Sequence, residues 1–314
     1  MTEVATSQKD AVMTNPTGEH HVIRSGTSEA HITEVGATLR ALTLDGVDVL
    51  DGFAAHERAT DGRGQVLAPW PNRIAEGRYQ YGGHDIQCPL TEPARSNAIH
   101  GLVRWLDWEL VDRQPDAVTL SCAVRPQPGY EWQLRLQVTY QLGDDGLTVR
   151  LNAVNTGDDR APFGAGFHPY LKISGRPVDD LVLRLPATQY LADIETATEV
   201  TQVEGTPFDF RAPRLVGSQV LDTAYTGLVP DERGRATVVL SDPAGGHEVQ
   251  LWVSEAYPHL MVYTGDHVHR SERRRASVAV EPMTCPPQAF RSGIDVVELE
   301  PEESWTGDWG LAAT

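Results

Sequence analysis

The chain has 314 residues, of which 40% are hydrophobic and 22% are charged, the composition of an ordinary globular protein with a substantial core. Its net charge of −18 argues against nucleic acid as a partner. No apolar run is long enough to span a membrane and the first residues lack a signal-peptide pattern, so we expect a cytoplasmic protein with no membrane partner.

The first 18 residues are polar and show no periodicity, which predicts a flexible N-terminal tail (1–18) ahead of one folded domain (19–314). Met13 offers a second possible start codon. The three cysteines are scattered and odd in number, so we expect no disulfide framework.

From residue 20 onward the chain alternates between strand patterns and turns rich in Gly, Asp and Pro. Strand patterns cover residues 20–25, 30–35, 38–44, 46–51, 79–81, 84–87, 108–112, 117–124, 132–142, 147–155, 179–186, 236–242, 247–254, 259–265, 276–282 and 295–301. Helical periodicity is scarce, and Gly82-Gly83 marks a hairpin.

Residues 134–142, "LRLQVTYQL", alternate with period two, which is typical of a strand with one face buried. No internal repeat indicates a propeller, and no linker divides the chain. The sequence therefore predicts an all-β protein, with antiparallel sheets packed face to face in a single large β-sandwich.

Four stretches rich in Pro or Gly interrupt the strands, at 61–77, 91–105, 163–170 and 281–290, and loops on a rigid scaffold often carry function. In the first, Asn72 and Arg73 place an amide beside a guanidinium, a pair that binds hydroxyl or carboxylate oxygens. A structural salt bridge is the alternative for Arg73.

The second stretch, "SNAIHGLVRW", holds His100 near Trp105 and Trp108. Aromatic faces beside hydrogen-bonding side chains suit a sugar. For Trp105, the core is the favoured alternative to a sugar platform.

The third stretch, "FGAGFHPY", sets His168 between small residues and Pro169, with Tyr170 following. The glycines allow close approach and the proline fixes φ, which would hold an imidazole rigidly at a pocket wall. A histidine in an ordinary bend is the alternative.

Glu281 ends the apolar strand of "ASVAVEP", where partial desolvation would raise its pKa and make it a usable base. A strand end that exposes Glu281 to water is the alternative. Asp222, in "VLDTAY", is a lone acid between apolar residues.

The basic run "RSERRR" at 270–275 could attract an anion, although a solvated hairpin loop is the favoured interpretation. His20-His21 and His267-x-His269 lack partners at metal-ligand spacing, so no metal is expected. "DGRGQ" at 61–65 lacks the spacing of a phosphate or dinucleotide loop, and no Gly-x-Ser-x-Gly elbow indicates a hydrolase.

The order Asn-Arg, His-Gly, His-Pro-Tyr, isolated Asp and Glu-Pro, from about residue 20 to 310, resembles the aldose 1-epimerase (galactose mutarotase) family. The resemblance implies a large antiparallel β-supersandwich, an isomerase that interconverts the α and β anomers of an aldose, an open sugar cleft, and no cofactor. It implies a small-molecule sugar as partner, and we expect a monomer or homodimer.

By resemblance, His168 is the general acid and Glu281 the general base, and the substrate-binding residues are Asn72, Arg73, His100, Tyr170 and Asp222. A base removes the proton of the C1 hydroxyl while an acid protonates the ring oxygen, the ring opens, and rotation about C1–C2 precedes closure.

Two departures from the family pattern concern the substrate. Met261 stands where many galactose mutarotases carry glutamine, so galactose specificity is in question, and "EPMTCPP" and "HPYL" also differ from the usual forms. These features resemble a less characterised bacterial branch.

Two alternatives to a mutarotase for neutral aldoses remain open. Arg104 in "HGLVRW" resembles the hexose-phosphate relatives, and Arg73, Arg104 and the 270–275 run converging on the cleft would indicate a sugar phosphate or acidic sugar. The other alternative is a non-catalytic sugar-binding protein on the same scaffold, which would need neither His168 nor Glu281.

Overall fold

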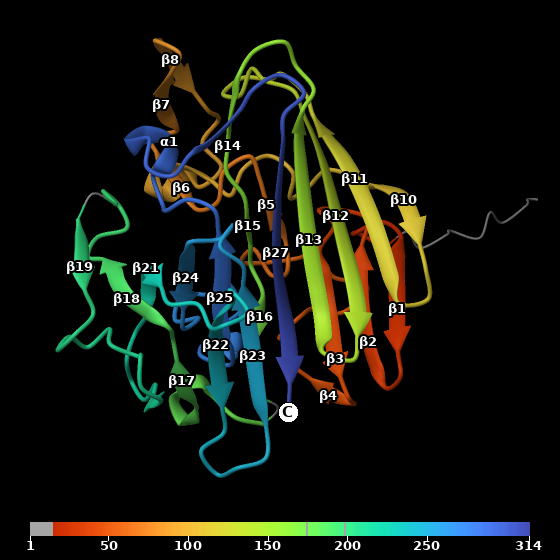
Figure 1. Ribbon diagram of the computed structural model, residues 1–314, viewed down its shortest axis with the longest axis vertical. Coiled ribbons are helices and arrows are strands. Elements are labelled where there is room, and N and C mark those ends of the chain that lie inside the picture. The colour runs from red at the N-terminus through yellow and green to blue at the C-terminus, as the bar shows by residue number, and fades with distance from the viewer. Residues whose placement is uncertain (1–14, 174, 198) are drawn as a thin grey trace, which may run out of the picture.

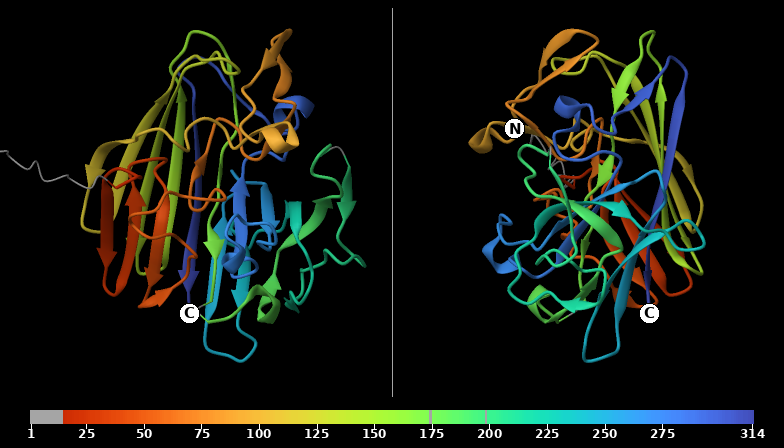
Figure 2. Two further views of the ribbon diagram at one scale, coloured as in Figure 1. Left: turned by 180° about the vertical axis from the view of Figure 1, so that it is seen from behind. Right: turned by 60° about the vertical axis from the view of Figure 1, so that its left-hand side comes forward.

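The computed structural model describes residues 15–173, 175–197 and 199–314, and within these residues almost all regular structure is antiparallel strand. Two large sheets pack against each other, as Figures 1 and 2 show. The described helical segments are a single turn of α-helix and three 3₁₀ turns: α1 (Ala289–Ser292), η1 (Pro93–Arg95), η2 (Val178–Asp180) and η3 (Ser271–Arg273). The predicted antiparallel supersandwich is confirmed.

The larger sheet has nine strands, and its long central strands lie side by side in Figure 1. Their order is β10 (Glu109–Arg113), β11 (Ala117–Val124), β12 (Leu134–Gly143), β13 (Gly146–Asn155), β27 (Ser304–Ala313), β23 (Glu248–Val253), β22 (Ala236–Ser241), β17 (Val182–Arg184) and β20 (Arg214–Leu215). Along β12, Leu134, Leu136 and Val138 are buried while Arg135 is exposed, so the predicted alternation is confirmed.

The second sheet has eight strands, and it carries the residues of most interest below. Its order is β19 (Val200–Gln202), β18 (Ala187–Leu191), β21 (Asp222–Leu228), β24 (His259–Tyr263), β25 (Val278–Met283), β15 (Gly166–Phe167) and β5 (Val66–Leu67), with β16 (Tyr170–Leu171) also paired to β25.

Smaller sheets complete the fold. The N-terminal one, which contacts β11 and β12, consists of β1 (His20–Ser25), β2 (Ser28–Thr33), β3 (Leu39–Leu44) and β4 (Val47–Asp48). The two-stranded pairs are β6 (Arg73–Ala75) with β9 (Asn97–Ile99), β7 (Arg78–Tyr81) with β8 (His84–Gln87), and β14 (Ala161–Phe163) with β26 (Val297–Leu299). Gly82-Gly83 joins β7 to β8, as the sequence predicts.

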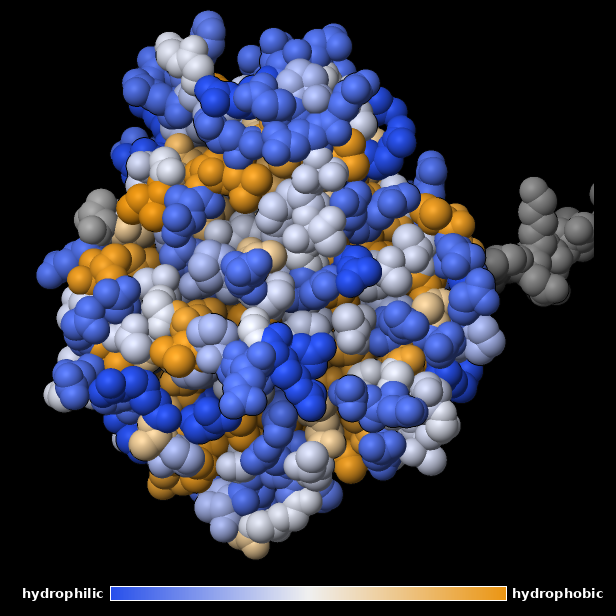
Figure 3. Space-filling view, viewed as in Figure 1, coloured by the Kyte–Doolittle hydropathy of each residue, from blue (hydrophilic) through white to orange (hydrophobic). Residues whose placement is uncertain are grey.

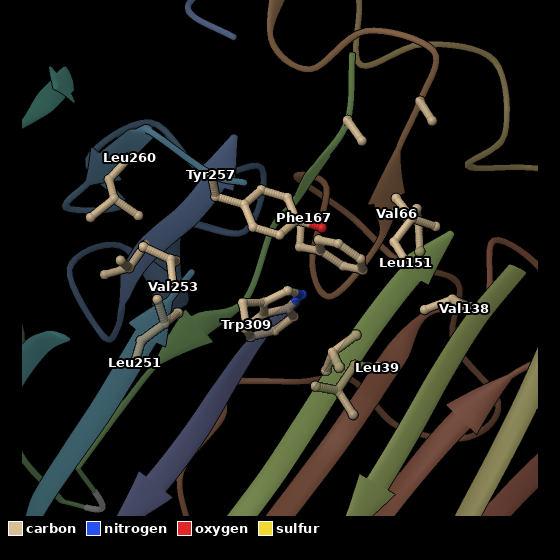
Figure 4. Close-up of a cluster of buried hydrophobic side chains, with 14 of the residues drawn as sticks. Leu39, Val66, Val138, Leu151, Phe167, Leu251, Val253, Tyr257, Leu260 and Trp309 are labelled. Atoms are coloured by element: carbon tan, nitrogen blue, oxygen red, sulfur yellow. The ribbon is translucent and has the colours of Figure 1, made fainter. Parts of the chain in front are cut away.

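The core fills the space between the two large sheets (Figure 4). Phe167 of the eight-stranded sheet packs against Trp309 of the nine-stranded sheet, with ring centroids 5.0 Å apart. Tyr257 and Leu151 join the same buried cluster. Because Phe167 immediately precedes His168, this packing anchors the backbone that carries the histidine.

The predicted tail is only partly within the described residues, since residues 1–14 lie outside them. Thr17 is buried, and its carbonyl accepts a hydrogen bond from the Val35 N–H. No described helix is long and apolar enough to cross a membrane. The face shown in Figure 3 is mostly hydrophilic with scattered apolar areas.

Candidate active site

A cavity of about 730 Å³ opens over one face of the eight-stranded sheet. All seven residues that the sequence singled out as catalytic or substrate-binding line it: Asn72, Arg73, His100, His168, Tyr170, Asp222 and Glu281. They come from segments more than 200 positions apart in the chain, so the fold itself brings them together.

Three neighbouring strands form the floor of this cavity. The register pairs Ala224 of β21 with Met261 of β24, and Met261 with Glu281 of β25. Asp222 pairs with Tyr263 in the same way. Because side chains two residues apart on a strand share a face, Asp222, Met261, Tyr263 and Glu281 all point into the cavity.

His168 and Glu281 form the buried centre of the site. His168 follows β15 directly, and its Nε2 lies 3.4 Å from Oε1 of Glu281. Both side chains are almost fully buried. His168 Nδ1 and Glu281 Oε2 are buried and have no hydrogen-bond partner among the described residues, which adds to the cost of charging either group.

The protein environment shifts the two pKa values in opposite directions. Burial, reinforced by the charges of Arg63 and Arg104, lowers the pKa of His168 to about 3. Burial and the nearby Asp222 raise the pKa of Glu281 well above its usual range, although Arg73 opposes this. Both shifts favour the neutral form of the group, His168 without its second proton and Glu281 with its proton.

Gly62 sets the position of the His168 ring. Its φ is +75°, and a Cβ at this position would lie 2.5 Å from Cδ2 of His168. Such a contact is far shorter than real atoms tolerate. Only glycine allows this loop to lie against the imidazole.

Arg63 and Tyr170 extend this packing. The rings of His168 and Tyr170 are stacked with centroids 4.9 Å apart. The Arg63 guanidinium lies 4.2 Å from the Tyr170 centroid and pairs with Asp51 and Asp61. The sequence predicted nothing for Arg63 or Gly62 beyond the absence of a phosphate loop. The available signal was an arginine between two glycines, directly after Asp61.

Asn72 and His100 hold each other through reciprocal hydrogen bonds. The His100 N–H donates to the Asn72 carbonyl at 2.9 Å, and the Asn72 N–H donates to His100 Nδ1 at 3.2 Å. Since Nδ1 accepts, neutral His100 carries its proton on Nε2. Both residues have positive φ, 53° and 62°, a strained conformation often found at functional sites.

His100, His168 and Glu281 are close enough to share a metal ion, since one ligand atom from each lies within 4.8 Å of the others. A metal on His100 Nε2 would displace its proton to Nδ1 and break the bond from the Asn72 N–H. His168 Nδ1 also lacks the carboxylate or carbonyl partner that usually orients a ligating histidine. The arrangement suits hydroxyl groups better than a metal.

Arg73 satisfies both of the interpretations that the sequence left open. Its Nε and one Nη bind Glu92 at 2.8 and 3.0 Å, so it does form a structural salt bridge. The same side chain lines the cavity. Glu92 thus fixes a guanidinium that can still reach a ligand.

One expectation about a neighbouring residue was wrong, and one open alternative can be compared with the structure. Trp105 is not a core residue: it is 51% exposed and lines the cavity, next to Arg104. The 270–275 run, for which a solvated loop was the favoured interpretation, does not line the cavity, and three of its arginines form ion pairs elsewhere. Arg270 binds Glu57, Arg273 pairs with Asp51, and Arg275 pairs with Asp179 and Asp266.

Comparison with known proteins identifies the family. The family model for aldose 1-epimerase matches residues 19–311. The chain belongs to the aldose 1-epimerase family. This epimerase family member is 35% identical to the uncharacterized protein YihR of Escherichia coli K12, over 90% of this chain and 89% of that protein.

Two further similarities connect the chain to this epimerase family. The mouse galactose mutarotase is 27% identical, over 80% of this chain and 78% of that protein. The crystal structure of the GalM/aldose epimerase homologue from C. elegans superposes with a TM-score of 0.82 at 19% identity, covering 94% of this chain and 99% of that one. The fold of this family member is therefore galactose mutarotase-like.

Proposed function

We propose that the protein is an aldose 1-epimerase, an isomerase that interconverts the α and β anomers of an aldose. The observation that carries the proposal is the buried pair His168 and Glu281, 3.4 Å apart, with pKa values shifted in opposite directions. Groups of this kind exchange a proton with a bound ligand.

The reaction needs one proton donor and one acceptor. With Glu281 ionised and His168 protonated, Glu281 removes the proton from the C1 hydroxyl while His168 protonates the ring oxygen. The C1–O5 bond breaks and C1 becomes an aldehyde. After rotation about C1–C2, His168 takes its proton back as O5 attacks the aldehyde, and Glu281 returns a proton to O1. No proton is gained or lost over the cycle, and each positioned transfer contributes about 10²- to 10⁴-fold.

Without a ligand, the site favours the protonation state that His168 and Glu281 have when the bound sugar is in its open-chain form. Neutral His168 beside protonated Glu281 is the state that exists once the ring has opened. Before the ring opens, the proton must therefore move from Glu281 to His168 when the pyranose binds. Sugar hydroxyl groups in the cavity would assist, by accepting a hydrogen bond from protonated His168 and donating one to ionised Glu281.

The other predicted residues bind and orient the sugar. His100 donates from Nε2, since its Nδ1 accepts the Asn72 N–H. Arg73 and Asp222 present a donor and an acceptor to hydroxyl groups, and Trp105 offers an apolar face to sugar C–H groups.

The alternative that belongs to a different functional class is a sugar-binding protein without catalysis. A binding protein gains nothing from burying an acid and a base in contact, because desolvating them costs free energy. The pair is therefore better explained by proton transfer.

The test is anomer exchange measured by NMR on glucose, galactose and other aldoses, with the wild type beside Glu281→Gln. We expect exchange faster than in buffer, and its loss in the variant. Sugar binding without any acceleration would instead establish the sugar-binding alternative.

A further inference from the structure

Arg104 is a cation on the cavity wall with no acidic partner. Its side chain is partly buried and lines the cavity beside Trp105. One Nη donates to the Ile99 carbonyl at 3.2 Å. The buried Nε has no acceptor, and no carboxylate within the described residues lies close enough to form an ion pair with the guanidinium.

The backbone holds this arginine in place. Gln65 donates a hydrogen bond from Nε2 to the Arg104 carbonyl at 3.0 Å. Gly36 also packs against that carbonyl so closely that a Cβ would lie 2.5 Å from its oxygen. The guanidinium is thus presented from a fixed wall rather than from a mobile loop.

The other arginines near the cavity differ from Arg104. Arg73 is neutralised by Glu92, and Arg95 forms an ion pair with Glu195. Arg63 is bound by Asp51 and Asp61. Arg58 lines the rim without an ion pair but is exposed, so water solvates it.

Arg104 is less solvated than Arg58, because its side chain is partly buried. Burial lowers its pKa to about 10, and Glu92 provides the opposing charge. Glu92 is already occupied by Arg73 and by the Asn97 amide. A partly desolvated guanidinium is stabilised by a charged acceptor, and a ligand in the cavity that Arg104 lines can supply one.

We propose that Arg104 forms a subsite for an anionic substituent, a phosphate or a carboxylate, on the aldose that the site converts. This inference rests on the proposed function, since it names the class of sugar that the same cavity accepts. Asp222, which would repel an anion, lies on the floor strand β21 and does not pair with Arg104. The substituent therefore lies toward Arg104 and Trp105, with the sugar ring between this wall and Glu281.

The test compares anomer exchange of glucose, glucose 6-phosphate and glucuronate by NMR, at one ionic strength, in wild type, Arg104→Gln and Arg104→Lys. Because Arg104 would form charged hydrogen bonds with the substituent, we expect the wild type to convert at least one anionic sugar with a kcat/KM about 10-fold or more above its kcat/KM for glucose. Arg104→Gln should reduce this ratio about 10-fold, and Arg104→Lys should retain part of it. The anion that is preferred distinguishes phosphate from carboxylate.

The control is Arg274→Gln, which removes an exposed arginine that does not line the cavity. It should leave the ratio at the wild-type value. A wild type that prefers glucose, or a ratio that Arg104→Gln leaves unchanged, overturns the subsite.

Failure of the proposed function gives a different result. If no sugar exchanges faster than in buffer, calorimetric titration with glucose 6-phosphate and with glucuronate still tests the subsite. Loss of anion affinity in Arg104→Gln, but not in Arg274→Gln, then supports the subsite while the epimerase proposal fails. No difference between the two variants overturns the subsite as well.

Discussion

The ring of Tyr170 lies parallel to the ring of His168, at an interplanar angle of 12° and a centroid distance of 4.9 Å. The Tyr170 hydroxyl donates to the Asp61 carbonyl at 3.0 Å, which fixes the tyrosine ring. The plane of the imidazole is thereby fixed as well, while its Nε2 lies 3.4 Å from Glu281. A proton-transfer group held in this way needs little reorganisation during the reaction.

Arg63 should tune the proton affinity of His168. Its charge lowers the pKa of His168, so Arg63→Met should raise that pKa and move the pH profile of kcat/KM toward higher pH. Arg63→Lys keeps the charge and should restore much of the wild-type profile. The pH dependence of anomer exchange measures both. A lower rate at every pH with no shift in the profile would show that Arg63 is only structural.

Gly62 should be required for the position of His168. Gly62→Ala places a methyl group 2.5 Å from the imidazole, so we expect at least a 10-fold loss of kcat. Gly46→Ala is the matched control, because Gly46 also has positive φ, +80°, but open space around its Cβ position. Both variants carry backbone strain, so equal losses of activity would contradict a specific effect on His168.

His168 and Glu281 should act as one unit. His168→Gln and Glu281→Gln should each lower kcat by about 10²- to 10⁴-fold. The double variant should be little worse than the poorer single variant, because either change already prevents the coupled transfer. Rate constants from NMR exchange decide this, and multiplicative losses would indicate independent roles.

Glu281 should cost the protein stability at neutral pH. Its pKa is raised in the folded state, so above about pH 4.3 unfolding releases a proton that the folded site retains. The Glu281 contribution to the stability of the wild type therefore falls as pH rises toward the folded-state pKa, and Glu281→Gln lacks this contribution.

The difference in Tm between Glu281→Gln and wild type should grow between pH 4 and pH 8. Each kcal/mol of difference in the free energy of unfolding corresponds to on the order of 2 °C in Tm. Thermal unfolding across this range provides the measurement. Buried neutral histidines affect both proteins equally, so they cancel in the difference. A constant or shrinking difference would show that Glu281 is ionised in the free site.

Met261 should limit the use of galactose. It lies directly across from Glu281 on the neighbouring strand and lines the cavity. Met261→Gln adds an amide at this point, and one neutral hydrogen bond of about 1 kcal/mol predicts about a 5-fold rise in the rate for galactose relative to glucose. Competitive exchange measurements on the two sugars test this. A rise for both sugars alike would indicate a general effect on Glu281.

The sequence by itself determined the architecture and the set of candidate residues. Residues 134–142 alternate between apolar and polar side chains, so one face of this strand must be buried. Because short turns join the strands, that face is buried by antiparallel sheets that pack on each other. The motif order was sufficient for the family, and it singled out His168 and Glu281, which the fold brings within 3.4 Å of each other.

Only the tertiary structure decided which charges remain available in the cavity. Nothing in the sequence pairs Arg73 with Glu92, directs Arg275 to Asp179, or leaves Arg104 without a carboxylate. Ion pairs depend on distances between segments that are remote in the chain, and local periodicity carries no information about them. The exposure of Trp105 and the contact of Gly62 with His168 were decided in the same way, by how loops pack on a sheet to which they do not belong.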